Sequence, residues 1–382
     1  MVKKIVCSST LLAALTLLFT GLASAQKFVY TNDDIGFAPN TVSGFSVGTS
    51  GALTLVPGSP FLTGGTGNGG GFFAANRTRA GIVGNCLFAG NTSSNDVSAF
   101  TIDTTTGALT LVGSPVPAGP FPDGNGIALA VTPNGAFVTA ANGGPIAVYS
   151  VAANCGISPI ASSPFPTMTQ TDGIKISQNG SFLAVAEGFQ YEMFSIAADG
   201  SLASIGGFPI TGGTFGAGVD INCLSTLLYG GEANIGQNIV DGYSISSTGT
   251  LTPVAGSPFV NSLGSNSNVV LLGAKPGTKP LVRDKLMFVS NQASNTVTVF
   301  NVAKSGKLSP VGAFPITNTF FPSGMDTSPD GAFLYVSNFN NEVNVFSVSS
   351  KGLLTEVAGS PFPTGQFGGL MSLAGFPPRA CK

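Results

Sequence analysis

A short pattern of residues recurs seven times along the chain, at intervals of about 50 residues. Each copy has an apolar residue, an aromatic residue three positions later, and Val or Ile two positions after the aromatic. The copies end at Val47, Ile102, Val151, Ile196, Ile245, Val302 and Val348. Apolar and polar residues alternate within the copies, as in residues 297–302, and this period of two indicates β-strands with one buried face. A repeat of this length predicts a ring or stack of similar supersecondary units.

Three further patterns accompany each copy. A Gly-containing turn follows it and leads to Leu or Ile and then to a Pro/Phe pair, as in Ser257-Pro258-Phe259. A short apolar strand that ends in a polar residue precedes it, as in residues 334–338. A still earlier strand closes with turn residues such as Pro329-Asp330-Gly331, which favour a tight reversal of the backbone. Four short strands in each of seven units predict an all-β fold, a seven-bladed β-propeller of four-stranded antiparallel blades.

The two ends of the repeat region complement each other. The first unit, from Phe28, starts with the second strand and lacks the innermost one. Residues 368–374, which follow the last unit, have the character of an innermost strand. We therefore predict that they pair with residues 28–32 and complete blade one, so that the C-terminal strand closes the ring and no sheet edge stays open. Residues 26–382 would then form a single propeller domain.

The N-terminus has the features of a secretory signal peptide over residues 1–25. Lys3 and Lys4 precede an apolar run at residues 11–22, and Ala23-Ser24-Ala25 fits the small-x-small cleavage pattern. The alternative is an uncleaved membrane anchor, for which the run is short. No later segment is long and apolar enough to span a membrane. We expect a secreted monomer, either periplasmic, extracellular or at the cell surface. The net charge of −2 offers no basic face for nucleic acid.

Four cysteines lie beyond the signal peptide: Cys86, Cys155, Cys223 and Cys381. An oxidising compartment outside the cytoplasm favours disulfide formation. Cys86 falls in the expected turn between the first two strands of blade two, and Cys381 falls near the equivalent turn of blade one. The sequence therefore predicts a Cys86–Cys381 disulfide and leaves the pairing of Cys155 and Cys223 open.

Polar residues end the second strands of the units and should line one face of the ring; they are Asn32, Asn91, Asn142, Glu187, Glu232, Asn291 and Asn338. One interpretation is that they cap the adjacent turns. The other is a polar ring at the channel mouth, where Asp33 and Asp34 follow Asn32 and where Asp172 begins an innermost strand. The candidate ligand-binding residues are Asn32, Asp33, Asp34, Asp172, Glu187 and Glu232, a set suited to a cation or a hydroxyl-rich ligand. Calcium prefers such oxygen ligands, but no dense calcium-loop motif is present, so we assign no metal site and no cofactor.

Several of these motifs resemble a known family. Tyr335-Val336-Ser337-Asn338 and Phe288-Val289-Ser290-Asn291 resemble the YVTN-type propeller repeat. The segments Gly306–Ser309 and Ser328–Gly331 are similar to the lactonase-type seven-bladed propellers, which include 6-phosphogluconolactonase and carboxymuconate-cyclising enzymes. The resemblance covers nearly all of the mature chain. It implies the propeller fold and a lactone hydrolase acting at the channel mouth.

The chain departs from that family in its chemistry. Members often carry Pro-Arg-His before an innermost strand, whereas this chain has Pro322-Ser323-Gly324 and no histidine at all. A catalytic histidine is therefore excluded, and we assign no catalytic residue. A phosphorylated lactone would require a basic pocket. The clustered basic residues are expected in first-to-second-strand turns on the opposite face; they are Arg77, Arg79, Lys275, Lys279, Arg283 and Lys285.

Two functions follow from these observations. The first is a non-catalytic secreted module that binds a small molecule, a glycan or a protein at the channel mouth. The second is a lactone hydrolase that uses Asp33, Asp34 or Glu187 with a bound water. The missing histidine and the missing basic pocket favour the first function and leave enzymatic activity an open question.

Overall fold

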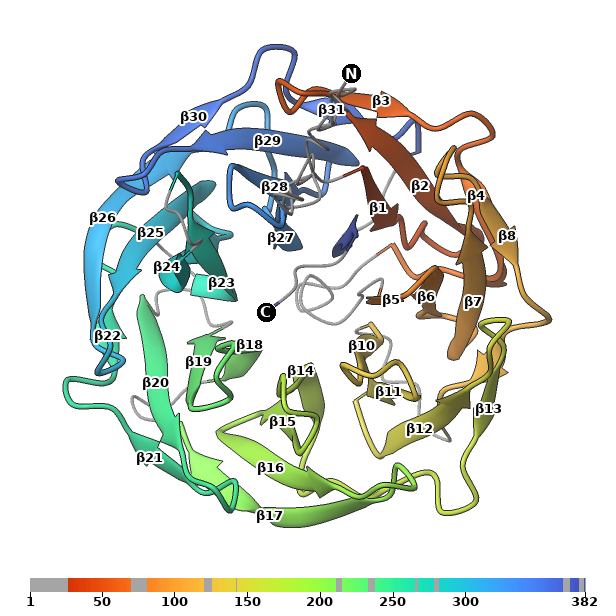
Figure 1. The fold of residues 1–382 in the computed structure, drawn as a ribbon, viewed down its shortest axis with the longest axis horizontal. Helices are drawn as coiled ribbons and strands as arrows, with labels where there is room; N and C mark the ends of the chain where they lie inside the picture. Colours follow the sequence, from red (N-terminus) through yellow and green to blue (C-terminus); the bar gives the residue numbers. More distant parts are fainter. Residues whose placement is uncertain are drawn as a thin grey trace, which may run out of the picture.

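Seven antiparallel sheets are arranged as blades around a central axis in the computed structural model (Figure 1). The structure describes residues 27–69, 81–119, 126–141, 143–210, 215–232, 238–264, 267–277, 282–366, 372–377 and 381. The regular elements among these residues are all β-strands, so the predicted all-β seven-bladed propeller is confirmed. None of the described residues belongs to a helix that could cross a membrane. The predicted signal peptide at residues 1–25 lies outside the described residues.

The first four blades follow the chain from its N-terminal side. Blade 1 contains β1 (Phe28–Asn32), β2 (Pro39–Val47), β3 (Leu53–Leu55), β4 (Phe61–Thr66) and β32 (Ser372–Phe376). Blade 2 contains β5 (Gly81–Val83), β6 (Cys86–Asn91), β7 (Asp96–Ile102), β8 (Leu109–Leu111) and β9 (Val116–Pro117). Blade 3 contains β10 (Ala128–Val131), β11 (Phe137–Ala141), β12 (Ile146–Val151) and β13 (Ile157–Pro159). Blade 4 contains β14 (Thr171–Ile176), β15 (Phe182–Glu187), β16 (Gln190–Ile196) and β17 (Leu202–Pro209).

The last three blades complete the ring. Blade 5 contains β18 (Gly216–Ile221), β19 (Leu227–Glu232), β20 (Ile239–Ile245), β21 (Leu251–Pro253) and β22 (Phe259–Val260). Blade 6 contains β23 (Ser267–Lys275), β24 (Val282–Asn291), β25 (Thr296–Val302) and β26 (Leu308–Pro315). Blade 7 contains β27 (Met325–Thr327), β28 (Phe333–Ser337), β29 (Glu342–Val348), β30 (Leu354–Glu356) and β31 (Phe362–Pro363).

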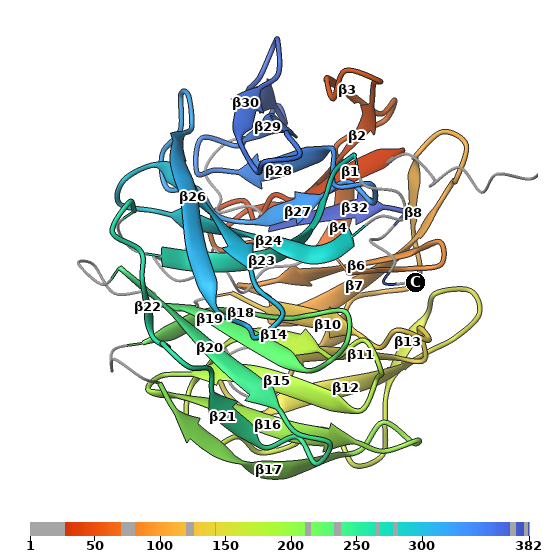
Figure 2. The ribbon, with the colours of Figure 1, turned by 60° about the vertical axis from the view of Figure 1, so that its left-hand side comes forward.

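The C-terminal strand closes the ring. β32 pairs antiparallel with β1, from Phe28 opposite Phe376 to Asn32 opposite Ser372. Figure 2 shows β32 beside β1 and next to β27 of the last blade. The predicted closure of blade one is therefore confirmed, with the strand two residues longer at its C-terminal end than expected. Residues 367–371, which include the first part of the predicted strand, lie outside the described residues.

The serine of the repeated Ser-Pro-Phe pattern holds the outer edge of a blade. Its hydroxyl accepts a hydrogen bond of 3.0 Å from a backbone amide of the third strand, which the broken fourth strand leaves without a ladder partner. This bond occurs in four blades, at Ser59 with Gly44, Ser163 with Val148, Ser257 with Gly242, and Ser360 with Val345. The motif therefore reflects strand geometry rather than chemistry.

Up-and-down strands give the ring two distinct faces. We call one the loop face: it carries the segments between second and third strands, such as residues 33–38, 188–189 and 338–341, and the segments that lead into the next blade, such as residues 167–170 and 317–324. We call the other the turn face: it carries the first-to-second and third-to-fourth turns, such as residues 84–85, 222–226 and 303–307.

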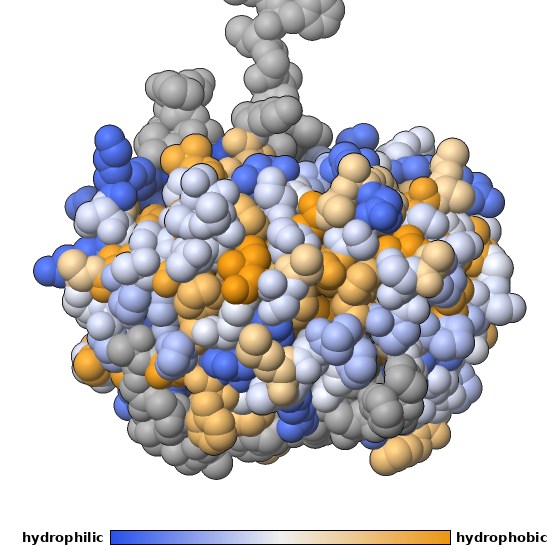
Figure 3. Space-filling model, turned by 90° about the horizontal axis from the view of Figure 1, so that it is seen from below, coloured by the Kyte–Doolittle hydropathy of each residue, from blue (hydrophilic) through white to orange (hydrophobic). Residues whose placement is uncertain are grey.

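Hydrophobic clusters lie between the blades. The seven clusters each combine buried residues from two adjacent blades, and one of them joins blade 7 to blade 1. Burial of both faces of every sheet explains why only 8% of the residues are charged. Seen from its side in Figure 3, the ring surface is a mosaic of apolar, weakly polar and strongly hydrophilic residues.

A glycine in the third-to-fourth turn of each of six blades packs against a residue at or near the start of the second strand in the preceding blade. We call this the turn–strand contact. The glycines have φ of 79–86°, a backbone conformation that residues with a side chain rarely adopt. A Cβ added to any of them would lie 2.5–2.9 Å from the partner side chain, closer than atoms can pack. The pairs are Phe28–Gly107, Phe137–Gly200, Phe182–Gly249, Leu227–Gly306, Leu286–Gly352 and Phe333–Gly51.

The seventh contact, between blades 2 and 3, is a disulfide. Cys86 is the first residue of β6, and Cys155 has φ of 69° in the turn that follows β12. These are the two positions that an apolar residue and a glycine occupy elsewhere, and here the two sulfurs are bonded. Every blade boundary therefore has one turn–strand contact.

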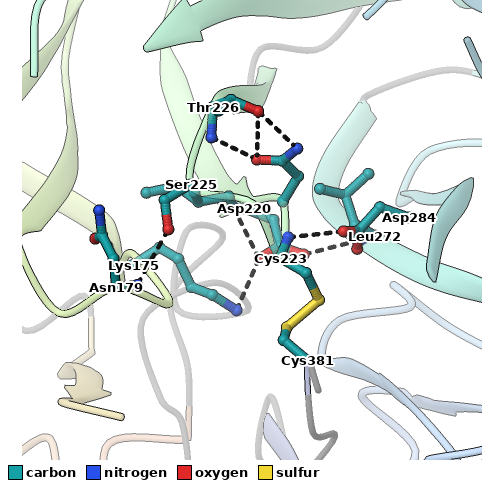
Figure 4. Close-up of a disulfide and its surroundings, with 11 residues drawn as sticks. Lys175, Asn179, Asp220, Cys223, Ser225, Thr226, Leu272, Asp284 and Cys381 are labelled. Carbon is teal, nitrogen blue, oxygen red and sulfur yellow. Dashed lines mark hydrogen bonds and ion pairs between the residues drawn. A yellow bond between two sulfur atoms is a disulfide. The ribbon is translucent and has the colours of Figure 1, made fainter. Parts of the chain in front are cut away.

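The predicted Cys86–Cys381 disulfide is wrong. Cys86 bonds to Cys155, and Cys381 bonds to Cys223. The error came from placing Cys86 in the first-to-second turn, whereas it begins the second strand and faces the neighbouring blade. Cys223 lies in the first-to-second turn of blade 5, so the second disulfide ties the chain end to the turn face of that blade (Figure 4).

The turn–strand contact predicts unequal costs for two glycine substitutions. Gly200→Ala should lower the free energy of unfolding by roughly 2–4 kcal/mol, because an unfavourable φ and a clash with Phe137 add together. Gly113→Ala is the matched control: Gly113 also has positive φ, but nothing lies within 4 Å of its Cβ position, so its cost should stay near 1 kcal/mol. Urea unfolding of both variants measures the difference, and equal losses would contradict the contact.

Candidate functional site

The polar residues at the ends of the second strands lie together on the loop face, as the repeat predicts. Asn32, Asn91, Glu187, Glu232 and Asn291 end β1, β6, β15, β19 and β24. Their side chains, and that of Asn338 after β28, are fully buried. Asn142 lies outside the described residues. Because they are buried, these groups do not face solvent.

Asn32 and Asn91 belong to one amide network that joins blades 1 and 2. Asn40 donates from Nδ2 to Asn32 Oδ1 and to Asn91 Oδ1, each over 2.9 Å. Asn91 in turn donates to Asp96 over 2.6 Å and to Ser98 over 2.7 Å, across its own hairpin. The contacts of Asn91 match the interpretation of these residues as turn caps.

Asp33 is the most completely satisfied of the candidate acids. Its carboxylate accepts hydrogen bonds from the hydroxyls of Thr31 (2.6 Å), Thr41 (2.7 Å) and Ser43 (2.8 Å). Burial raises the pKa of Asp33 to about 6, and the three hydroxyls oppose that rise. With both oxygens engaged in the blade, Asp33 holds the β1–β2 loop in place.

Asp34 fastens that loop to the segment leading into blade 2. The buried carboxylate accepts from the Asn68 amide over 3.3 Å, and the Asp34 carbonyl accepts from the Gly69 amide over 2.8 Å. Burial raises the pKa of Asp34 to about 6. A further backbone bond joins Phe37 to Gly67 over 2.9 Å. The two segments therefore support each other, and they carry Phe37 outward with 82% of its surface exposed.

Glu187 forms a buried carboxyl pair with Glu192 in blade 4. Glu187 lies opposite Gln190 and Glu192 lies opposite Val185, so the two side chains share one face of the sheet. Glu187 Oε2 accepts from the Thr169 amide over 3.2 Å, and Glu192 Oε2 accepts from the Met168 amide over 3.0 Å. Burial first, and Glu192 second, raise the pKa of Glu187 to about 8. Glu187 therefore keeps a proton near neutral pH.

Asp172 and Glu232 are buried in neighbouring blades. Asp172 lies at the irregular start of β14, next to Thr171, which pairs with Glu187. Glu232 lies opposite Gly216 at the start of β18. The candidate residues therefore fall into two groups, one in blade 1 (Asn32, Asp33, Asp34) and one in blades 4 and 5 (Asp172, Glu187, Glu232). Within the part of the chain that the structure describes, no three acidic or cysteine side chains form a metal-binding group.

Ser323 occupies the position where the family resemblance predicts a basic residue. Its buried hydroxyl lies 3.1 Å from the Ser337 hydroxyl, and its amide donates to the Ser337 carbonyl over 2.7 Å. The segment before β27 is therefore bonded to β28 of its own blade. Lys275, Arg283 and Lys285 flank the first-to-second turn of blade 6, as expected, while Arg77, Arg79 and Lys279 lie outside the described residues.

The sequence reasoning missed an ion pair between innermost strands. Lys175 of β14 lies 2.7 Å from Asp220 of β18, and Asp220 also accepts from the Leu272 amide of β23 over 2.8 Å (Figure 4). Asp326 holds the equivalent position in blade 7 and accepts from the Gly375 amide over 2.9 Å. These acids connect the inner strands of adjacent blades. Alignment of the repeats places Lys175, Asp220 and Asp326 at one position and could have revealed them.

Exposed apolar residues are concentrated on the loop face. Eleven large hydrophobic residues are exposed among those described, and seven of them lie on this face. We call them the loop-face apolar set: Phe37, Leu62, Met168, Phe189, Val260, Leu263 and Phe320. Phe320 also packs edge-on against Phe321 and Phe339, with ring centres 4.2 and 5.8 Å away. Phe37 and Phe321 both have φ of 50°, a conformation that bulky residues rarely adopt.

Comparisons with known proteins agree with this architecture. The model of the lactonase family of seven-bladed β-propellers matches residues 281–366. A candidate 6-phosphogluconolactonase from Bacteroides uniformis has 15% sequence identity and a TM-score of 0.69, over 91% of this chain and 100% of that one. The periplasmic gluconolactonase of Pseudomonas aeruginosa has 18% identity and a TM-score of 0.63, over 89% of this chain and 98% of that one.

The chain is a lactonase-like seven-bladed β-propeller. No curated protein matches its sequence. At these identities the similarity between structures shows the fold alone, and one fold can support unrelated functions. The activity of this lactonase-like propeller must therefore be argued from its own residues.

The carboxyl pair predicts a pH dependence of stability. Glu187 has a pKa of about 8 when folded, against 4.5 for an ordinary glutamate. Between these values the folded chain retains a proton that the unfolded chain releases. The free energy of unfolding should therefore fall as pH rises from 4.5 to 8 and level off above that. Glu187→Gln should flatten this decline and stabilise the protein at pH 8 by roughly 2 kcal/mol.

Chemical unfolding at several pH values tests this prediction. Asp199→Asn is the control. Asp199 is exposed, and hydrogen bonds from Ser201 lower its pKa, so this substitution should change the pH dependence of stability only in more acidic solution. If the free energy of unfolding of Glu187→Gln fell between pH 4.5 and 8 as steeply as that of the unmodified protein, the carboxyl pair would not hold a proton.

Proposed function

We propose that this lactonase-like propeller is an exported, non-catalytic binding module that receives a protein partner on its loop face. The observation that carries the proposal is the display of Phe37. This phenylalanine is 82% exposed and has φ of 50°, and backbone bonds to Gly67 hold it in that position. A strained and exposed aromatic residue costs free energy, and such positions concentrate at binding sites.

The rest of the loop-face apolar set supports a broad contact. Its seven members are 45–82% exposed and come from blades 1, 4 and 5 and from the segments that lead into blades 4, 6 and 7. Aromatic residues and methionine are enriched at protein interfaces, and large exposed apolar patches on soluble proteins mark interaction sites. Residues spread around a ring suit a protein surface better than a small molecule, which would require one enclosed pocket.

The side-chain chemistry favours a protein over a glycan. All six tyrosines are fully buried, and the chain has no tryptophan. The exposed aromatic residues on this face are phenylalanines, which lack the polar group that lets Tyr and Trp act at partly hydrated surfaces. A dry, apolar contact is therefore the better match.

The state of the carboxylates argues against hydrolysis. The three hydroxyls on Asp33 and the backbone bonds to Asp34 and Glu192 occupy oxygens that a water-activating base would need. The chain also has no histidine, which is the most frequent general base in enzymes. Export is supported by the two disulfides, since such bonds persist outside the reducing cytoplasm.

A lactone hydrolase is the second candidate, and one observation favours it. Glu187 keeps a proton near neutral pH, as a general acid must. The resemblance to lactonases supplies the substrate class. In this alternative, a water molecule would attack the lactone carbonyl carbon, and Glu187 would donate its proton to the ring oxygen as the ring C–O bond breaks. The proton that the water releases would restore Glu187, and the product would be the open hydroxy acid.

Site-specific photo-crosslinking tests the binding proposal. A photoreactive residue at position 37 should trap one protein from the exported fraction of the native host, and the same residue at position 224 should not. Leu224 is the matched control because it is 78% exposed on the opposite face. With the trapped protein purified, Phe37→Ser combined with Phe189→Ser should weaken binding at least tenfold, while Leu224→Ser should leave it unchanged. Equal effects of both changes would contradict the proposal.

A panel of sugar lactones separates the two candidates. The binding module should hydrolyse none of them faster than buffer does. Turnover that is lost in Glu187→Gln but retained in Asp199→Asn would instead establish the hydrolase.

A further inference from the structure

Four lysines meet on the turn face at the boundary between blades 6 and 7. Lys304 and Lys307 are exposed in the turn between β25 and β26, where the Ala303 amide donates to the Lys307 carbonyl over 3.0 Å. Leu286 of β24 lies opposite Asn301 of β25. Lys285 therefore lies one residue nearer that turn. The hairpin thus brings three of the four lysines to one tip of blade 6.

The turn–strand contact adds the fourth lysine from the next blade. Gly352 packs so closely on Leu286 that a Cβ would lie 2.9 Å from its Cδ2. Lys351 precedes Gly352 and is exposed, while Lys285 precedes Leu286. The contact that joins the blades therefore also brings Lys285 and Lys351 together. We call Lys285, Lys304, Lys307 and Lys351 the lysine cluster.

The four lysines of this cluster outnumber the acids in the adjacent turns of blades 6 and 7. None of the four lysines forms an ion pair with another described residue. The ion pair between Lys175 and Asp220 joins blades 4 and 5 and lies away from the cluster. The acids on this side of blades 6 and 7 hold backbone groups instead. Asp284 accepts from the Cys223 amide over 2.7 Å, and Asp330 accepts from the Ala332 amide over 3.0 Å.

From this geometry we infer that the lysine cluster binds a linear polyanion with closely spaced phosphate groups. Like charges at one place repel one another, and a bound polymer relieves that repulsion and releases its own counterions. Lysines bind phosphate as point charges, without the fixed two-pronged geometry of arginine. The site should therefore respond to charge density along the polymer and not to a particular monomer.

The inference is independent of the partner proposed for the other face. The cluster lies on the turn face, and the loop-face apolar set lies on the opposite end of the ring. A polymer bound here would leave the loop face accessible, so the two sites can be tested separately.

Binding of the full mature chain to long-chain inorganic polyphosphate tests the inference. We expect binding at low salt that weakens steeply as salt is raised, and at least tenfold weaker binding of orthophosphate. Combining Lys285→Gln, Lys304→Gln and Lys307→Gln should lower the affinity at least tenfold and reduce the salt slope by about three. Single-site comparison uses Lys307→Gln against Lys27→Gln, which removes the same charge from an exposed lysine of blade 1.

Three results would overturn the inference. They are absence of polyphosphate binding at low salt, an equal loss of affinity in Lys27→Gln and Lys307→Gln, and binding to vesicles of anionic lipid with no binding to polyphosphate. Unfolding curves of the variants check that the exposed substitutions leave the fold intact.

Discussion

The ring depends on one small contact that is repeated at every blade boundary. A turn residue with positive φ lets a third-to-fourth turn press against a residue near the start of the second strand in the preceding blade. Six boundaries use glycine against an apolar side chain, and the seventh uses the Cys86–Cys155 bond. Because Phe333 and Gly51 join the last blade to the first, the contact closes on itself. The hydrophobic clusters between blades supply most of the burial, and the turn–strand contacts fix how each blade is set against the next.

This arrangement explains how the two faces differ. On the turn face the contacts place short turns at defined positions, and the exposed lysines of blades 6 and 7 come together as a result. On the loop face the polar residues that end the second strands are buried and hold hairpins and connecting segments in place. Asp33 with its three hydroxyls and Glu187 with Glu192 are both part of that support. Seven of the eleven exposed large hydrophobic residues among those described also lie on the loop face, and this favours recognition over hydrolysis.

Much of the fold could be predicted from the sequence, because the signals are local. The alternation in residues 297–302 and turns such as Pro329-Asp330-Gly331 depend on short-range sterics, and a repeat multiplies each signal sevenfold. Closure by the C-terminal strand followed from counting strands. The disulfide was predicted wrongly, although the information was present: aligned repeats put Cys155 where other blades have glycine and Cys86 where they have Phe, Leu or another apolar residue. The partners of Glu187 could not be predicted, because the positions of Glu192 and Thr169 around it depend on sheet register and on a loop path.

The equivalence of the disulfide and the glycine contact can be measured directly. In the background of Cys86→Ser/Cys155→Ser, which lacks the bond, the free energy of unfolding should fall by about 2–4 kcal/mol. Cys86→Phe/Cys155→Gly should be more stable than that variant by roughly 1–3 kcal/mol, because it rebuilds the contact used at Phe137 and Gly200. The reversed pair, Cys86→Gly/Cys155→Phe, has the same composition but places Phe at φ of 69° and should show no such gain. If the two arrangements were equally stable, the turn–strand contact would not be what sets the blades against one another.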